Sequence, residues 1–182
     1  MSQDFQEARG ELPVLSPEGA QLQLRDVWAD SPAVIAFVRH FGCIFCREQV
    51  RDLRARKGEI ERLGARLIIV GNGTPEQADS FRTSMRGDLE VYTDPSRETY
   101  RAAGLRRGAL AAMGPRTWIG TLRAAAGGSF PKGRMGDPLQ LGGVFVVLPD
   151  GSTPYAHVSR FAGDHPKPDT VLAALDSALK TA

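Results

Sequence analysis

The chain has 182 residues, enough for one domain with a full hydrophobic core, and its 42% hydrophobic and 24% charged content is ordinary for a globular protein. Its net charge of +2 comes from scattered basic residues, mostly arginine, which argues against nucleic acid as a partner. No run is long enough to cross a membrane, and the polar residues 1–11 hold no apolar signal-peptide core. We therefore expect a cytoplasmic protein without a membrane partner.

Apolar and alternating runs, bounded by turn residues, predict the strands in chain order. We expect an extended segment at 12–15 and strands at 21–24, 33–39, 66–70, 89–93, 143–148 and 153–159. Amphipathic patterns and capping residues predict a helical turn at 26–28 and helices at 43–63, 74–85, 95–103 and 169–180. Residues 104–140 interrupt this alternation, and we expect a helical insertion there, with helices at 107–113 and 115–126.

The order of these elements predicts an α/β fold. Strands that alternate with helices require parallel pairing and crossover helices, whereas the final hairpin adds antiparallel strands. A mixed central sheet flanked by helices is the thioredoxin-like architecture. We expect one such domain over residues 12–182, preceded by a flexible tail at 1–11.

Two cysteines, the only ones in the chain, form the pattern Cys43-Ile44-Phe45-Cys46 where a buried strand meets a helix. At a helix N-terminus, free backbone N–H groups and the helix dipole favour a thiolate, so Cys43 is predicted to be the nucleophile. Cys46 lies one turn further on and can close a disulfide with it. The pattern predicts a thiol–disulfide redox centre of the thioredoxin type.

Other interpretations of the cysteine pair remain. A structural zinc site needs about four ligands, and the three histidines, His40, His157 and His165, have no ligand-like spacing, so no metal site is expected. Two buried and inert cysteines are the other alternative. His165 has no chemical assignment from the sequence and is interpreted as a loop histidine with satisfied hydrogen bonds.

Three further residues flank the cysteines, and each could stabilise a thiolate. Arg39 ends the strand at 33–39, but the sequence does not settle which side of the sheet it faces. His40 equally suits local packing, and Arg47 equally suits the helix surface.

Five segments resemble the peroxiredoxin-like branch of the AhpC/TSA antioxidant superfamily, which includes the prostamide/prostaglandin F synthases and selenoprotein L. They are residues 37–48, 70–73, 91–95, 136–146 and 162–166. The resemblance implies a thiol oxidoreductase that reduces hydroperoxides through a Cys43/Cys46 disulfide. It implies no bound cofactor, an external reductant (thioredoxin or a small thiol) and a possible homodimer.

The chain also departs from the peroxiredoxin pattern. His40 stands where the pattern has threonine, Ala36 where it has proline, and the usual arginine before the strand at 144–148 is missing from Gln140–Gly143. These departures predict slower peroxide reduction and favour a second hypothesis, a reductase of small-molecule disulfides or of lipid endoperoxides. A third hypothesis is a non-enzymatic redox sensor.

Overall fold

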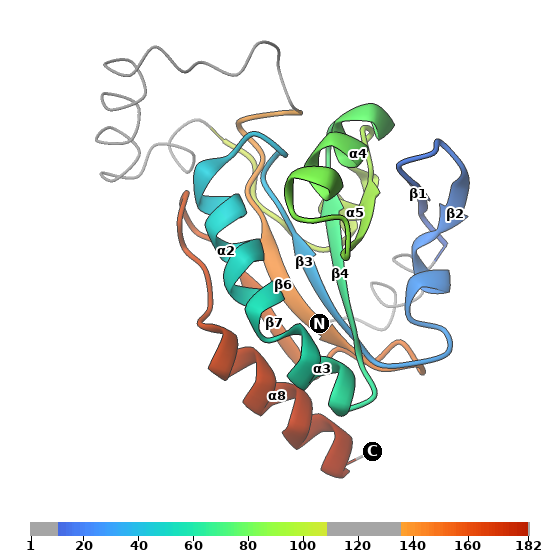
Figure 1. The fold of residues 1–182 in the computed structure, drawn as a ribbon, viewed down its shortest axis with the longest axis vertical. Helices are drawn as coiled ribbons and strands as arrows, with labels where there is room; N and C mark the ends of the chain where they lie inside the picture. Colours follow the sequence, from blue (N-terminus) through green and yellow to red (C-terminus); the bar gives the residue numbers. More distant parts are fainter. Residues whose placement is uncertain (1–10, 109–135, 182) are drawn as a thin grey trace.

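The computed structural model describes residues 11–108 and 136–181. Their strands form one seven-stranded sheet of order β2-β1-β5-β4-β3-β6-β7 (Figure 1). The strands are β1 (Pro13–Leu15), β2 (Gln21–Gln23), β3 (Ala33–Phe37), β4 (Arg66–Gly71), β5 (Glu90–Thr93), β6 (Gly143–Val147) and β7 (Tyr155–Val158). The helices are η1 (Leu24–Val27), α2 (Ile44–Ala55), α3 (Lys57–Arg62), α4 (Pro75–Ser84), α5 (Glu98–Ala102) and α8 (Pro168–Thr181).

The sheet is mixed, as the sequence predicts. β3 pairs in parallel with β4, and β4 in parallel with β5, through crossovers that carry α2, α3 and α4. β6 lies on the other side of β3 and runs antiparallel to both β3 and β7. Ile35 is therefore paired with Ile68 on one side and Phe145 on the other, at the centre of the sheet. The α/β thioredoxin-like fold is confirmed.

Both faces of the sheet are covered, so β3 is apolar at every position instead of alternating. Val34 and Ala36 face a core formed with α2, α3, α4 and α8. Ile35 and Phe37 face a second core that includes residues of η1 and α5. The sheet is thus held rigidly at the end of β3, where the two cysteines follow.

The predicted single helix at 43–63 is wrong, because the helix divides at Arg56. The backbone of Arg56 leaves the helical conformation at φ −106° and ψ 8°, which ends α2 and begins α3. Gly58 lowers helix propensity directly after the break, and the Arg56 guanidinium pairs with Glu59 and with Asp169 of α8. By contrast, α4 begins as predicted, with Thr74 as N-cap and Gln77 completing the capping box.

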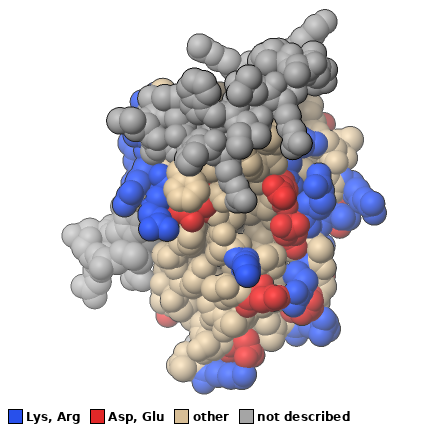
Figure 2. Space-filling model, turned by 90° about the vertical axis from the view of Figure 1, so that its left-hand side faces the viewer, with Lys and Arg blue, Asp and Glu red and all other residues tan. Residues whose placement is uncertain are grey.

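Most of the predicted insertion and tail lies outside the described residues, including the predicted helix at 115–126 and most of the one at 107–113. The two described ends of the insertion lie together, since Arg107 bridges to Gln140 and the Gly108 N–H donates to the Leu139 carbonyl at 3.1 Å. Among the described residues, no helix has the length and apolar character to cross a membrane. Basic and acidic side chains are interspersed over the face seen in Figure 2.

Candidate active site

The two cysteines follow the carboxyl end of β3, next to the end of β4. The Val38 N–H donates to the Val70 carbonyl at 2.8 Å and extends the pairing of the two strands. The buried Tyr100 hydroxyl lies 2.7 Å from the Val38 carbonyl and 2.9 Å from the Val70 carbonyl, so it ties both strand ends together from α5. The turn that leads to α2 therefore starts from a fixed point.

Cys43 is the N-cap of α2. Its backbone is extended, at φ −73° and ψ 119°, and its carbonyl accepts the first helical hydrogen bond, from the Arg47 N–H at 3.0 Å. A hydrogen bond from the Cys46 thiol is the main cause that lowers the pKa of Cys43 to about 6. Burial opposes this shift, and the Arg39 charge and the N–H groups of Cys46 and Phe45 add to it. Cys43 is thus mainly a thiolate at neutral pH.

Cys46 behaves in the opposite way. It is 1% exposed, and burial followed by the neighbouring Cys43 raises the pKa of Cys46 well above its usual value. Its sulfur accepts a hydrogen bond from the Arg39 N–H at 3.3 Å. Both cysteines are free in this structure, and the opposite pKa shifts favour the thiolate at Cys43 and the thiol at Cys46.

Arg39 points toward the cysteines, which answers the question of its orientation. Its side chain is buried, and Nη1 lies 3.7 Å from the Cys43 Sγ. The guanidinium also donates to the Pro138 carbonyl at 2.7 Å and to the Gln140 carbonyl at 3.3 Å. The described residues 136–142 before β6 therefore contain no arginine, but carbonyl groups of this segment hold Arg39, which follows β3.

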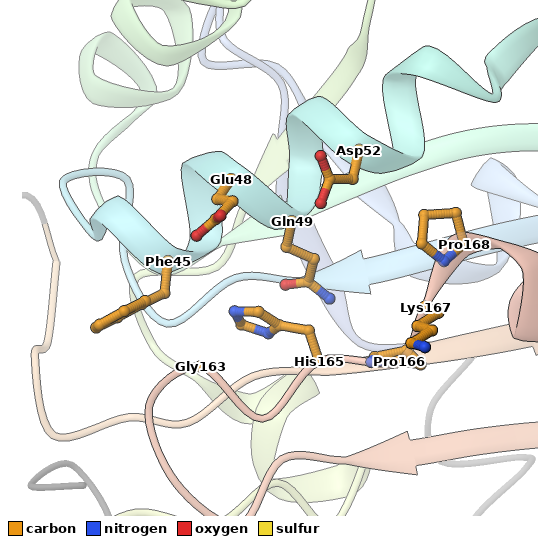
Figure 3. A pocket seen from close by; sticks show the side chains of 9 residues that line it. All are labelled: Phe45, Glu48, Gln49, Asp52, Gly163, His165, Pro166, Lys167 and Pro168. Atoms are coloured by element: carbon orange, nitrogen blue, oxygen red, sulfur yellow. The ribbon is translucent and has the colours of Figure 1, made fainter. Parts of the chain in front are cut away.

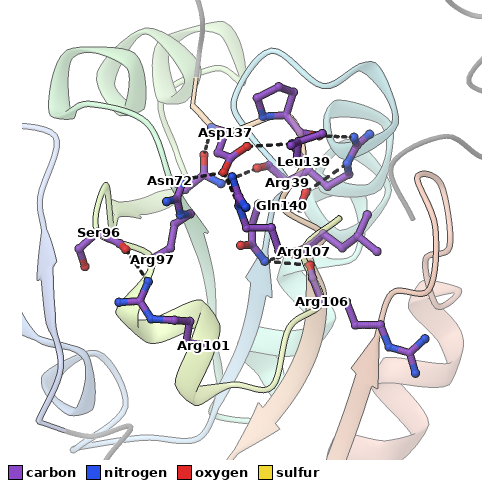
Figure 4. A network of polar contacts seen from close by, with 12 residues as sticks. Arg39, Asn72, Ser96, Arg97, Arg101, Arg106, Arg107, Asp137, Leu139 and Gln140 are labelled. Atoms are coloured by element: carbon purple, nitrogen blue, oxygen red, sulfur yellow. Dashed lines mark hydrogen bonds and ion pairs between the residues drawn. The ribbon is translucent and has the colours of Figure 1, made fainter. Parts of the chain in front are cut away.

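A polar network, which the sequence did not reveal, fixes the segment that holds Arg39 (Figure 4). Asp137 forms ion pairs with Arg97 at 2.6 Å and Arg107 at 2.8 Å. The buried Asn72 donates to the Arg39 carbonyl at 2.8 Å and accepts from the Asp137 N–H at 2.9 Å. Two signals were available: Asn72 follows a parallel strand at its carboxyl end, where sites gather in α/β sheets, and Asn72 and Asp137 both lie in segments that carry the family resemblance.

Glycine is required at 136 for this network to close. Gly136 has a φ of +107°, and a Cβ added there would lie 2.1 Å from the Asn72 Oδ1. Any larger residue would separate Asn72 from the Asp137 N–H.

The other two predicted site residues, His40 and Arg47, do not supply a positive charge to the sulfurs as Arg39 does. Burial, with a smaller effect of the Arg39 charge, lowers the pKa of His40 to about 4, so His40 is neutral at pH 7 and adds no positive charge beside Cys43. Arg47 turns toward α4, where it donates to the Ser84 Oγ at 2.9 Å and lies 5.6 Å from the centre of the Phe81 ring. Among the described residues, no contact joins the Arg47 guanidinium to either sulfur.

The expectation that His165 is a satisfied loop histidine is wrong. Neither of its ring nitrogens has a hydrogen-bond partner in the described part of the chain. The physical reason is that the ring lies near the Phe45 backbone but outside hydrogen-bond geometry, at the wall of a cavity of about 480 Å³. Across the described ranges, no cluster of three or more His, Cys, Asp or Glu side chains could hold a metal ion.

A seven-stranded mixed sheet with a Cys-x-x-Cys pair at the start of its first long helix is typical of thioredoxin-fold thiol oxidoreductases. The profile of the AhpC/TSA antioxidant enzyme family matches residues 52–160, a range that begins after both cysteines. The chain belongs to this family, whose peroxiredoxin-like members are thiol oxidoreductases.

Individual relatives and structures agree with the family. Human peroxiredoxin-like 2C is 32% identical over 91% of this chain and 77% of its own length. The prostamide/prostaglandin F synthase of Sus scrofa is 33% identical over 86% of this chain and 80% of its own. The structure of peroxiredoxin Q from Xanthomonas campestris has a TM-score of 0.68 at 20% identity, covering 95% of this chain and 94% of that one.

Proposed function

We propose that this protein reduces hydroperoxides, with Cys43 as the nucleophile and Cys46 as the resolving thiol. The Cys43 thiolate attacks one peroxide oxygen, the O–O bond breaks, and the departing alkoxide takes a proton to become an alcohol or water. The Cys46 thiol then attacks the Cys43 sulfenic acid, water leaves, and a disulfide forms. Two thiol equivalents from an external reductant restore both cysteines and are themselves oxidised to a disulfide.

One observation carries this proposal: Cys43 caps α2 with the Arg39 Nη1 3.7 Å from its Sγ, and in this setting the pKa of Cys43 is lowered while that of Cys46 is raised. A nucleophile must be ionised at neutral pH. A resolving thiol, by contrast, should stay protonated and unreactive toward the peroxide until the sulfenic acid has formed. Burial alone, the interpretation of an inert pair, would raise both pKa values.

Arg39 supports peroxide chemistry in particular. Of the five guanidinium N–H donors, three are engaged with Cys43, Pro138 and Gln140 among the described residues, which leaves two for a peroxide oxygen. A donor beside the thiolate can stabilise the charge that develops as the O–O bond breaks. Arg39 would thus replace the arginine that peroxiredoxins carry before the strand equivalent to β6.

Stopped-flow mixing of the reduced protein with hydrogen peroxide tests the proposal. We expect rapid loss of both thiols in the wild type, a stable sulfenic acid in Cys46→Ser, and no fast phase in Cys43→Ser. Mass spectrometry should show the wild-type product lighter by two hydrogen atoms. If Cys43 shows no fast phase with hydrogen peroxide or with an alkyl hydroperoxide, the proposal is wrong.

The similarity to a prostamide/prostaglandin F synthase supports a second candidate, reduction of a lipid endoperoxide by the same pair. The same assay with an endoperoxide and with a small-molecule disulfide would rank these substrates. Formation of the disulfide without turnover by any reductant would instead indicate a redox sensor. Cytoplasmic location, a thioredoxin-type reductant, a homodimer and a single domain over 12–182 remain predictions.

A further inference from the structure

A cavity of about 480 Å³ lies along α2, between this helix and the loop that joins β7 to α8 (Figure 3). Its volume is within the range typical of small-molecule sites, about 300–1,000 Å³. Phe45 of the Cys-x-x-Cys pattern forms one wall, and a Cβ at Gly163 would be only 3.5 Å from its ring, so the loop closes directly on the redox motif. The cavity thus shares Phe45, the residue directly before Cys46, with the redox motif.

The floor of the cavity holds hydrogen-bonding groups without partners. Gln49 is 6% exposed, and its Nε2 has no partner among the described residues. Figure 3 shows its amide on α2 and the His165 ring on the facing loop directed toward each other. Leaving such a donor unpaired in a buried position is costly, so a protein seldom keeps one without a ligand or water to satisfy it.

Charged groups of both signs border the same cavity. Glu48 and Asp52 lie one turn apart on the exposed side of α2 and supply two carboxylates. Lys167 supplies an ammonium group from the opposite loop, next to Pro166 and Pro168. The rim therefore suits a ligand that carries both an ammonium and a carboxylate, while Phe45, Pro166 and Pro168 supply apolar wall for the rest of it.

We propose that this cavity binds the reductant, and that the reductant is a small zwitterionic thiol, an amino acid or short peptide with a free amine and a free carboxylate. Its carboxylate would accept hydrogen bonds from Gln49, His165 and Lys167, and its amine would lie near Glu48 and Asp52. This inference rests on the proposed function, because it assigns the thiol that reopens the Cys43–Cys46 disulfide.

The reductive step balances with two thiol molecules. The thiolate of the first attacks one sulfur of the protein disulfide, the S–S bond breaks, and the released cysteine takes up a proton. The second thiol attacks the resulting mixed disulfide. One small-molecule disulfide leaves, and both cysteines regain their reduced form.

Binding can be measured apart from redox chemistry. S-methylglutathione, a zwitterionic peptide with a blocked sulfur, is titrated into Cys43→Ser/Cys46→Ser protein by calorimetry. We expect saturable binding that Gln49→Met weakens by about 10- to 100-fold, the loss typical of a hydrogen bond to a charged group. His165→Phe should weaken it too, and Asp176→Asn, in a separate hollow between α3 and α8, should not. Absence of saturation at millimolar concentrations, or binding insensitive to both cavity variants, would overturn the proposal.

The kinetic arm uses protein with intact cysteines. Gln49→Met should slow reduction of the disulfide by glutathione about tenfold or more and leave reduction by 2-mercaptoethanol, which has no charged groups, unchanged. If Gln49→Met slows reduction by thioredoxin but not by glutathione, the cavity serves a protein partner and the proposal is wrong. A wild type that never forms the disulfide would refute the proposed function. The binding titration would still show whether the cavity binds a zwitterionic peptide.

Discussion

The acidity of Cys43 depends on one neighbouring thiol more than on any other group. Because the hydrogen bond from Cys46 is the main cause of the lowered pKa, Cys46→Ala should raise the pKa of Cys43 from about 6 by about one unit or more. The pH dependence of iodoacetamide alkylation measures it. Cys43→Ser is the control, in which Cys46 should label slowly at neutral pH because its own pKa is raised. Faster labelling of Cys46 than of Cys43 at neutral pH would reverse the two roles.

Arg39 is the second residue on which reactivity depends. Arg39→Met should lower the rate constant for hydrogen peroxide by about 10²–10³-fold, the loss typical when a donor to a developing negative charge is removed. Arg39→Lys should recover little of it, since an ammonium cannot reach Cys43, Pro138 and Gln140 together as the planar guanidinium does.

Arg47→Met is the matched control for Arg39, because it removes an arginine that contacts α4. Its rate constant should stay close to that of the wild type in the same stopped-flow assay. An equal loss of rate constant in Arg39→Met and Arg47→Met would contradict this. It would show that the rate depends on the net positive charge near the site and not on the contacts of Arg39.

Among the elements, the segment that leads into β6 acts on the site without touching the sulfurs. Asp137→Asn should weaken its attachment to Arg97 and Arg107 and loosen the carbonyl groups that orient Arg39. The expected result is a higher pKa for Cys43, measured by alkylation, with a smaller shift than in Arg39→Met. Asp150→Asn, in the turn between β6 and β7, is the control and should leave the pKa unchanged. An unshifted pKa in Asp137→Asn would mean that the segment holds its shape without this carboxylate.

The elements were largely predictable because each carries local signals. The apolar run of β3 and the capping residues of α4 act within a few residues of one another, and both elements form where expected. At the break at Arg56 the only local signal is Gly58, and the contact of Arg56 with Asp169, 113 residues further along the chain, could not be predicted. The same is true of the site: Cys43 and Cys46 are neighbours in sequence, whereas the contacts of Arg39 with Pro138 and Gln140 span 99 and 101 residues.

For the whole molecule, burial of histidine links stability to pH. The pKa of His40 is lowered to about 4 from an ordinary value of 6.5, mainly by burial, with Arg39 adding to the effect and Asp137 opposing it. Burial also lowers the pKa of His165. Between the two His40 values, the unfolded chain binds a proton that the folded protein does not, so stability falls as pH falls through this window.

The free energy of unfolding of the reduced protein should therefore decrease from pH 6.5 toward pH 4, and His40→Gln should remove part of that decrease. The difference between wild type and variant is at most about 3 kcal/mol, because each pKa unit corresponds to about 1.4 kcal/mol. Urea unfolding at several pH values measures it, with the variant compared to the wild type at each pH so that carboxylate protonation cancels. Some pH dependence of the free energy of unfolding should remain in His40→Gln. The pKa of His165 is also lowered by folding, so His165 too makes the protein less stable as the pH falls. Parallel curves for the two proteins across this window would show that His40 is solvated in solution, and that the turn before Cys43 is more open than in this structure.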